Sequence, residues 1–345
     1  MITQLLKEVG RGKRGARDLE GEEASLAADL IVNRKATPAQ IGAFLIAERI
    51  KMESVDELEA FVLECRSQAY REPIHQGLDC AGPYDGRKKS FYATFPTAFL
   101  LVSAGLPITL HGAPSLPPKW GLTLHDLLNE LDIKADRLPR EQLIRTARDT
   151  GVLYVPTEEW CPPLGKLRGI REELGMRTVL NTAEKLIDFS LSPYLVYGVY
   201  HNTVFERMSK LMSNLKYKRA LIVQGAEGSE DAFIDRPTRT YLVENGESEL
   251  HVLNPDSYGV QTQLPEIEWT AERQVIVAEE VLSGEGHMAF ANQVMLNAAV
   301  RLRLADKVDS IEEGLYTCKS LLDSGKPLEL YRRWRNSLRS GVKTV

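Results

Sequence analysis

Apolar stretches that alternate with helical stretches constrain the fold of this chain most strongly. After residue 73 the segments LDCAG, TAFLLVSAG, LPITLHG, LTLHDLLNEL and GVLYV follow one another, and the pattern resumes with SPYLVYGVY and RALIVQG. Such alternation is typical of βαβ units, whose crossover helices pack on a mainly parallel sheet. The sequence therefore predicts an α/β domain with a central, mainly parallel sheet flanked by helices over residues 76–345.

The N-terminal region has helical periodicity instead. Apolar side chains recur three and four positions apart between residues 20 and 70, which fits three helices. The segments TPAQ at 37–40 and SVDE at 54–57 have the pattern of capping boxes, so they mark two helix starts. We expect residues 1–75 to form a small helical domain, together with helices from about residues 160–185.

The remaining segments give mixed signals. Two prolines at 162–163 disfavour a helix, so the stretch from Trp160 is expected to begin as a loop and to continue as a helix. Asn245-Gly246 predicts a hairpin turn within β structure at residues 236–267. Helical patterns return near the C-terminus at residues 293–304, 310–323 and 327–338.

Composition excludes several classes of protein. The four cysteines lie far apart and form no CxxC pair, so the sequence signals neither a zinc site nor a disulfide framework. The chain has no apolar run of about 18 residues, and its N-terminus lacks the pattern of a signal peptide. We expect a cytoplasmic protein without a membrane span. The net charge of −5 argues weakly against a nucleic-acid coat, but it leaves a local basic patch possible.

Four stretches, in order, carry a resemblance to a known family. They are ATPAQIGAFLIAERIKMES at 36–54, IREELGMRTVLN at 170–181, YGVYHNTVFERMSKLMSNLKYKRALIVQGAEGSED at 197–231 and NAAVRLRLADKVDSIEEGLYTCKSLLDSGKPLE at 297–329. Together they resemble the anthranilate phosphoribosyltransferases and their nucleoside phosphorylase relatives. The resemblance implies a homodimer formed through the N-terminal helices. It also implies a phosphorylated ribose donor, phosphoribosyl pyrophosphate, bound with Mg²⁺.

The donor-binding loop departs from the family pattern. The family has GTGGDG there, because glycine amides approach a polyanion without obstruction by side chains. This chain has GPYDGRKKS at residues 82–90, where a proline removes one donor amide and a tyrosine adds bulk. Gly82 matches the family pattern directly, and Asp85 and Gly86 match if one residue is deleted.

The resemblance assigns further positions to the donor and acceptor sites. Thr94 keeps one hydroxyl of the family's NxST segment, whereas the lysine and arginine of its KHGNR segment are absent around His111 and Gly112. The implied donor or phosphate contacts are Gly82, Asp85, Gly86, Thr94, His111, Gly112 and Lys119.

Metal and acceptor positions follow in the same way. The acidic pair Glu230-Asp231 matches the family's magnesium ligands in reversed order, and either acid suits Mg²⁺. Arg171 matches the arginine that contacts anthranilate. Structural alternatives remain open: a solvated turn for the acidic pair, a helix-surface ion pair for Arg171 and a capped loop residue for His111. No catalytic residue is assigned.

The basic run Arg87-Lys88-Lys89 has two interpretations. It is a solvated charge cluster, or it is a polyanion-binding loop whose cations contact a nucleic-acid backbone. The second interpretation agrees with a resemblance to a divergent branch of the family, some of whose members bind nucleic acid.

Two functional hypotheses follow. The first is phosphoribosyl or pentosyl transfer to an unknown acceptor, with metal and cationic stabilisation of the leaving pyrophosphate. The second is a catalytically lapsed homodimer that binds nucleic acid or another polyanion. A nucleoside phosphorylase is disfavoured, because the lysine of the phosphate loop is absent.

Overall fold

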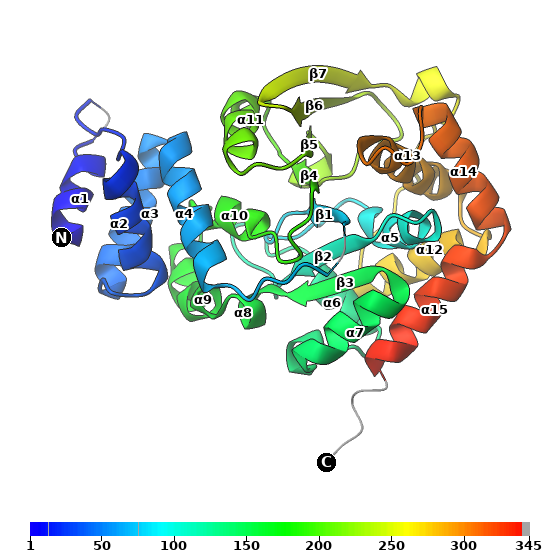
Figure 1. The fold of residues 1–345 in the computed structure, drawn as a ribbon, viewed down its shortest axis with the longest axis horizontal. Helices are drawn as coiled ribbons and strands as arrows, with labels where there is room; N and C mark the ends of the chain where they lie inside the picture. The colour runs from blue at the N-terminus through cyan, green and yellow to red at the C-terminus, as the bar shows by residue number, and fades with distance from the viewer. Residues whose placement is uncertain (13, 75, 340–345) are drawn as a thin grey trace, which may run out of the picture.

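The protein is described by a computed structural model, which covers residues 1–12, 14–74 and 76–339. It has an N-terminal helical bundle beside an α/β domain built on a seven-stranded sheet (Figure 1). The strands are β1 (Leu78–Ala81), β2 (Ile108–Gly112), β3 (Val152–Pro156), β4 (Tyr194–Gly198), β5 (Arg219–Val223), β6 (Thr238–Glu244) and β7 (Glu247–Leu253). The predicted α/β class is confirmed.

The order of the strands is β3-β2-β1-β4-β5-β6-β7. The first five strands in this order pair in parallel, and β6 and β7 continue the sheet as an antiparallel hairpin. The hairpin turns at Asn245-Gly246, and both residues have the positive φ that such a turn requires. The predicted mainly parallel sheet and the predicted hairpin turn are therefore both present.

Helices account for most of the remaining chain. Those of the N-terminal bundle are α1 (Ile2–Val9), α2 (Gly21–Val32), α3 (Pro38–Lys51) and α4 (Val55–Gln68). The later helices are α5 (Thr94–Ser103), α6 (Leu124–Glu130), α7 (Arg140–Thr150), α8 (Thr157–Trp160), α9 (Pro162–Leu174), α10 (Leu180–Ala183), α11 (Phe205–Asn214), α12 (Ala271–Ser283), α13 (Met288–Leu304), α14 (Ile311–Asp323) and α15 (Lys326–Arg339).

Helices α3 and α4 begin where the predicted capping boxes place their starts. In α3 the Thr37 hydroxyl accepts from the main chain of Gln40, and the Gln40 side chain accepts from the main chain of Thr37. Ser54 and Glu57 form the same reciprocal pair at the start of α4. Each pair satisfies two main-chain donors that a helix start would otherwise leave without partners.

One boundary differs from the prediction. The two prolines at 162–163 do not lie in a loop but occupy the first turn of α9. The first helical positions have no intrahelical acceptor for an N–H group, so proline costs nothing there, and its fixed φ suits the helix. Helix α9 packs against α3 and α4, so this segment lies beside the N-terminal bundle.

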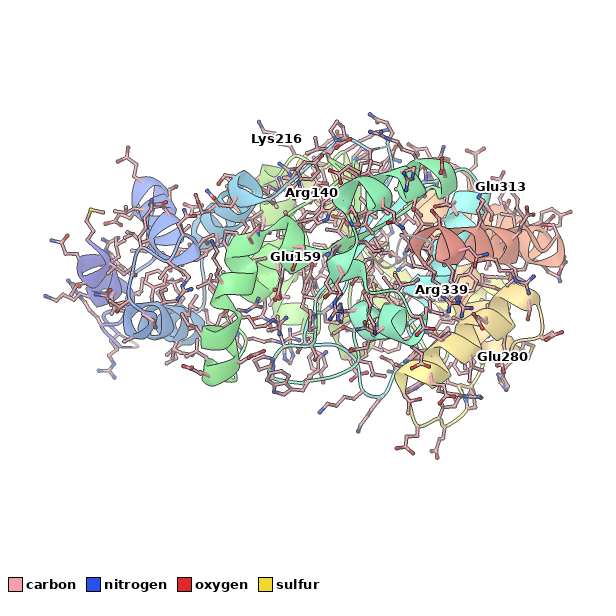
Figure 2. All side chains as sticks on the ribbon, turned by 90° about the horizontal axis from the view of Figure 1, so that it is seen from below. Arg140, Glu159, Lys216, Glu280, Glu313 and Arg339 are labelled. Carbon is pink, nitrogen blue, oxygen red and sulfur yellow. The ribbon has the colours of Figure 1, made fainter. Side chains whose placement is uncertain are left out.

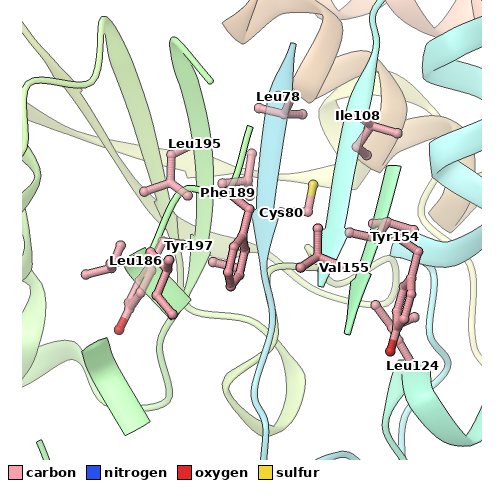
Figure 3. Close-up of a cluster of buried hydrophobic side chains, with 14 of the residues drawn as sticks. Leu78, Cys80, Ile108, Leu124, Tyr154, Val155, Leu186, Phe189, Leu195 and Tyr197 are labelled. Carbon is pink, nitrogen blue, oxygen red and sulfur yellow. The ribbon is translucent and has the colours of Figure 1, made fainter. Parts of the chain in front are cut away.

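The core of the α/β domain surrounds the parallel strands. Every residue of β1, β2 and β3 is buried, as expected for strands covered on both faces. Figure 3 shows Leu78 and Cys80 of β1 between side chains of β4, such as Leu195, and side chains of β2 and β3, such as Ile108. The rigid sheet fixes the loops at its carboxyl edge.

Figure 2 labels charged side chains on several helices and loops, among them the exposed Lys216 and Glu313. Some of them join distant segments: Arg339 of α15 forms an ion pair with Asp132, and the Arg140 guanidinium lies 3.9 Å from the centre of the Tyr70 ring. Across residues 1–12, 14–74 and 76–339, no helix combines the length and apolar character needed to cross a membrane.

Candidate functional site

The candidate site lies where the direction of the strand order changes. β1 has β2 on one side and β4 on the other, so the chain builds outward from β1 both ways. Open α/β sheets bind ligands at the carboxyl ends of strands at such a switch point. Residues 82–90 follow β1, and residues 199–201 follow β4, so both segments border this crevice.

Two glycines let the loop after β1 pack closely on the protein itself. A Cβ atom at Gly82 would lie 2.6 Å from Oε2 of Glu230. Gly86 has a φ of +76°, and a Cβ atom there would lie 2.3 Å from the main-chain oxygen of Gly121. Arg87 continues this close approach through a short antiparallel bridge. The space that these glycines leave open is filled by atoms of this chain.

The three consecutive cations of this loop do not share one surface. Lys88 and Lys89 are exposed, but Arg87 points inward and is only 1% exposed. Its Nη1 atom donates to Oδ2 of Asp231 at 2.5 Å, and its Nη2 atom donates to both oxygens of Glu230 at 3.2 Å. The expectation of three solvent-facing cations is thus not met at Arg87, because the guanidinium finds buried carboxylates 143 and 144 residues later in the chain.

The electrostatics of this cluster keep its groups charged. Burial alone would lower the pKa of Arg87, but the charges of Asp231 and Glu230 outweigh it and raise that pKa. Burial alone would likewise raise the pKa of Asp231, but Arg87 and Arg301 hold it below its usual range. Oδ1 of Asp231 also accepts from the Thr94 hydroxyl at 2.6 Å and from Arg301 at 3.1 Å. Thr94 is thus a buried partner of the acidic pair.

This acidic pair does not fit a magnesium ion. All four carboxylate oxygens of Glu230 and Asp231 accept hydrogen bonds from guanidinium groups, and both residues are buried. Mg²⁺ needs carboxylate oxygens that face it, and it usually keeps several of its waters. Within the described ranges, no three or more His, Cys, Asp or Glu side chains are arranged to hold a metal. Glu230 and Asp231 therefore act as partners of arginines rather than as metal ligands in this structure.

Asp85 and Lys119 meet at the mouth of the crevice. Oδ1 of Asp85 lies 3.2 Å from Nζ of Lys119, and Oδ2 of Asp85 accepts from Arg177 at 2.6 Å. Lys119 also donates to the main-chain oxygen of Glu227 at 2.7 Å. Lys119 and Arg177 outnumber the single carboxylate between them, so this group has an excess of positive charge.

His111 and Gly112 end β2, but the histidine is enclosed. Its Nδ1 atom lies 2.6 Å from the Tyr84 hydroxyl, and its Nε2 atom lies 3.2 Å from Oδ1 of Asp79. The Tyr84 hydroxyl also lies 2.6 Å from the hydroxyl of Thr157. His111 is therefore part of a buried polar chain, and its ring does not line the cleft.

Arg171 is also buried and bound to another side chain of the protein. Its two Nη atoms donate to the two oxygens of Glu184 at 2.7 and 2.9 Å, and both residues are buried. Burial raises the pKa of Glu184, although Arg171 offsets part of the effect. Arg171 is therefore paired with Glu184 and does not face an acidic acceptor in this structure.

A cleft of about 390 Å³ lies between the bundle and the α/β domain. Arg49, Glu53 and Leu58 line it from the bundle, and Pro83, Asp85 and residues 197–201 line it from the sheet edge. Its side chains include five cations against the two acids Glu53 and Asp85; the cations are Arg49, Lys119, Arg177, Lys185 and Arg207. The cleft therefore attracts anions.

Lys185 is the most unusual of these cations. Its side chain is buried, its Nζ atom donates to the main-chain oxygen of Gly198 at 2.6 Å, and it lies 3.8 Å from the centre of the Tyr197 ring. Burial and then the charge of Arg177 lower its pKa to about 7. An anion in the cleft would supply the negative charge that favours the ammonium form.

A second depression adjoins the cleft. Lys89, Arg236 and Arg239 line it, and the Arg236 guanidinium lies 3.8 Å from the centre of the Phe233 ring. Tyr200 and His201 line both the depression and the cleft, so the two lie side by side. Exposed cations beside aromatic rings suit a phosphate backbone with attached bases.

Sequence reasoning missed several of these residues. Arg301 pairs with Asp231, and Lys185 lies in the cleft, but neither was expected to have a role. Each had a detectable signal: a charged residue at a position where the helical pattern, NAAVRLRL or TAEKLI, places a buried side chain. A charge on a buried face implies a partner or a ligand.

Comparisons with known proteins match both parts of the chain to one family. Residues 81–328 match the model for the glycosyl transferase family, a/b domain, and residues 3–69 match the model for the helical bundle domain of the same family. Anthranilate phosphoribosyltransferase from Persephonella marina is 27% identical over 99% of this chain and 100% of its own length. The enzyme from Symbiobacterium thermophilum is 29% identical over 97% of each chain.

Solved structures show the same fold. Anthranilate phosphoribosyltransferase from Thermus thermophilus superposes with a TM-score of 0.84 at 24% identity, over 97% of this chain and 99% of that one. The Saccharomyces cerevisiae enzyme in complex with PRPP and Mg has a TM-score of 0.81 at 17% identity, over 98% of both chains.

Proposed function

Since the chain belongs to the glycosyl transferase family with helical bundle and a/b domains, we propose that its cleft binds a phosphorylated ribose through side-chain cations, without carboxylate-held magnesium. The observation that carries this proposal is the charge of the cleft. Five cations line it, while the acidic pair beside it is neutralised by arginines. The relatives that transfer a phosphoribosyl group support the same ligand class.

Phosphate recognition is divided among several elements. Lys119 and Arg177 lie at the mouth of the crevice, Lys185 and Arg207 come from the α/β domain, and Arg49 comes from the bundle. Lysine and arginine donate charge-assisted hydrogen bonds to phosphate, and they are worth more in a partly enclosed site than in water. In phosphoribosyl transfer these cations would stabilise the charge of the departing pyrophosphate. The acceptor is expected to differ from anthranilate, because Arg171 is bound to Glu184.

Calorimetric titration with phosphoribosyl pyrophosphate tests this proposal. We expect saturable binding in EDTA, at least as tight as binding in Mg²⁺, because free donor carries more negative charge than its magnesium complex. Arg177→Ala should weaken the binding, whereas Lys319→Ala, at an exposed helix position, should leave it unchanged. Binding that appears only when Mg²⁺ is present would contradict the proposal.

The pH dependence of binding should report on Lys185. Its pKa is about 7 in the folded protein, so the side chain is an ammonium below that pH and a neutral amine above it. An anion is held more tightly by the ammonium, so affinity should fall as the pH rises through 7. In Lys185→Met the fall in affinity should disappear. Any pH dependence that remains should come from titration of the ligand's own phosphate groups. If affinity changes with pH equally in the parent and in Lys185→Met, Lys185 does not contact the ligand.

A second candidate function is nucleic-acid binding, and the cations that line the adjoining depression favour it. Lys88 and Lys89 are exposed beside the surface lined by Arg236 and Arg239, although Arg87 is not available. Fluorescence anisotropy with labelled oligonucleotides at several salt concentrations measures the number of phosphate contacts. Lys88→Ala with Lys89→Ala should lower the slope of log K against log salt by about 1.4 for single strands if both contact phosphates. An unchanged slope would exclude these two lysines.

The proposal includes the homodimer that the resemblance implies. A face formed by α1 and α3 has Ile50 and Met52 exposed, at 68% and 50%. Contiguous exposed apolar patches on a folded protein mark interaction surfaces, and Leu6, Ile46 and Ala47 line the same face. Two copies joined there would bring two clefts into one assembly.

A further inference from the structure

The charges of the acidic pair and of its two arginines cancel one another. Glu230 and Asp231 supply two negative charges, and Arg87 and Arg301 supply two positive ones, with all four side chains buried. Buried ions of this kind are stable only when they are paired and hydrogen-bonded. The cluster therefore needs no further cation for neutrality.

We propose that the Arg87 guanidinium is a tethered replacement for a divalent cation, so that this chain binds no metal at Glu230 and Asp231. The guanidinium bridges the two carboxylates as an ion would: Nη1 contacts Asp231 and Nη2 contacts Glu230. Nη1 also donates to the main-chain oxygen of Phe91 at 2.8 Å, which anchors it further.

The surroundings of Arg87 hold it in place. The Tyr92 ring lies 3.9 Å from its Cζ atom, and Gly82, which has no Cβ atom, lets the main chain pack closely against the Glu230 carboxylate. The Gly86 turn and the bridge at Arg87 fix the direction in which the arginine leaves the main chain. These contacts hold the guanidinium in one position between the two carboxylates.

The replacement differs from a metal in one respect. An arginine remains protonated at every pH at which the protein folds, so its charge cannot be removed by chelators or by titration. A divalent ion would have to displace the guanidinium or lie beside it against strong repulsion. Loop residues 82–90 should consequently keep one conformation whether or not divalent ions are present.

Removal of Arg87 should allow Glu230 and Asp231 to bind a divalent metal ion. Arg301 would then be left with two carboxylates, and the cluster would have one uncompensated negative charge. We expect Arg87→Ala to be less stable than the parent protein and to gain saturable Mn²⁺ binding, seen as loss of the free-ion signal in electron paramagnetic resonance. Added Mn²⁺ should raise its melting temperature. Arg87→Ala with Glu230→Gln should lose this gain.

Controls separate the charge of Arg87 from its volume. Arg87→Met keeps most of the bulk and should also bind Mn²⁺, whereas Arg87→Lys keeps a cation and should not. Lys88→Ala removes the neighbouring exposed cation and, like the parent, should bind no Mn²⁺ at the acidic pair. Stoichiometric Mn²⁺ binding by the parent that is lost in Glu230→Gln would overturn the proposal. A folded Arg87→Met that binds no Mn²⁺ would overturn it too. None of these results depends on the sugar ligand.

Discussion

Asp231→Ala is expected to lower the free energy of unfolding by about 3–5 kcal/mol, the range found when one partner of a buried ion pair is removed. The variant leaves Arg87 and Arg301 buried near each other without their shared carboxylate. Thr94 loses its acceptor as well. Urea denaturation followed by circular dichroism measures the change.

A comparison variant makes this result specific. Asp323 forms an exposed ion pair with Lys319 four residues earlier in α14, so Asp323→Ala should scarcely change the midpoint. Asp231→Asn keeps the shape of the side chain and removes its charge. Its free energy of unfolding should therefore lie between those of Asp231→Ala and the parent. If Asp231→Ala lowers the free energy of unfolding no more than Asp323→Ala does, the four charges of the cluster are not buried and mutually paired as the structure shows.

Arg171→Met should be destabilising by a similar amount, again about 3–5 kcal/mol. Glu184 would remain buried without a counter-charge, and burial already raises its pKa. Without Arg171 the folded state should hold a proton on Glu184 that the unfolded state releases. Stability should therefore fall as the pH rises, and the deficit should be smallest in acid solution.

A double variant tests the same pair from the other side. Arg171→Met with Glu184→Gln removes both charges, so most of the lost stability should return. The measurement is a double-mutant cycle by urea denaturation. If the two single losses simply add, the pair is not coupled, and Arg171 would again be a candidate for an acceptor contact in the cleft.

Much of the fold could be predicted because its signals are local. The capping boxes at Thr37 and Ser54 involve residues three positions apart, and the hairpin turn involves two neighbouring residues. The alternation of strands and helices needs only the apolar pattern of each segment. The start of α9 was misplaced because proline has opposite effects in a helix interior and in its first turn.

The site was harder to predict because its partners are distant in sequence. Arg87, Lys88 and Lys89 are alike as a string of cations, and which one turns inward depends on carboxylates more than 140 residues later. The same holds for Arg301, which is more than 200 residues from Thr94. Gly82 and Gly86 also illustrate this, because the atoms that require a glycine come from Glu230 and Gly121.

Arg87 neutralises the acidic pair in place of a metal, and anomalous diffraction from crystals of the unmodified protein soaked in Mn²⁺ measures this without any substitution. We expect no anomalous peak between Glu230 and Asp231, with Arg87 bound to both carboxylates as in the present structure. A peak at coordinating distance from both carboxylates, with Arg87 displaced, would contradict it.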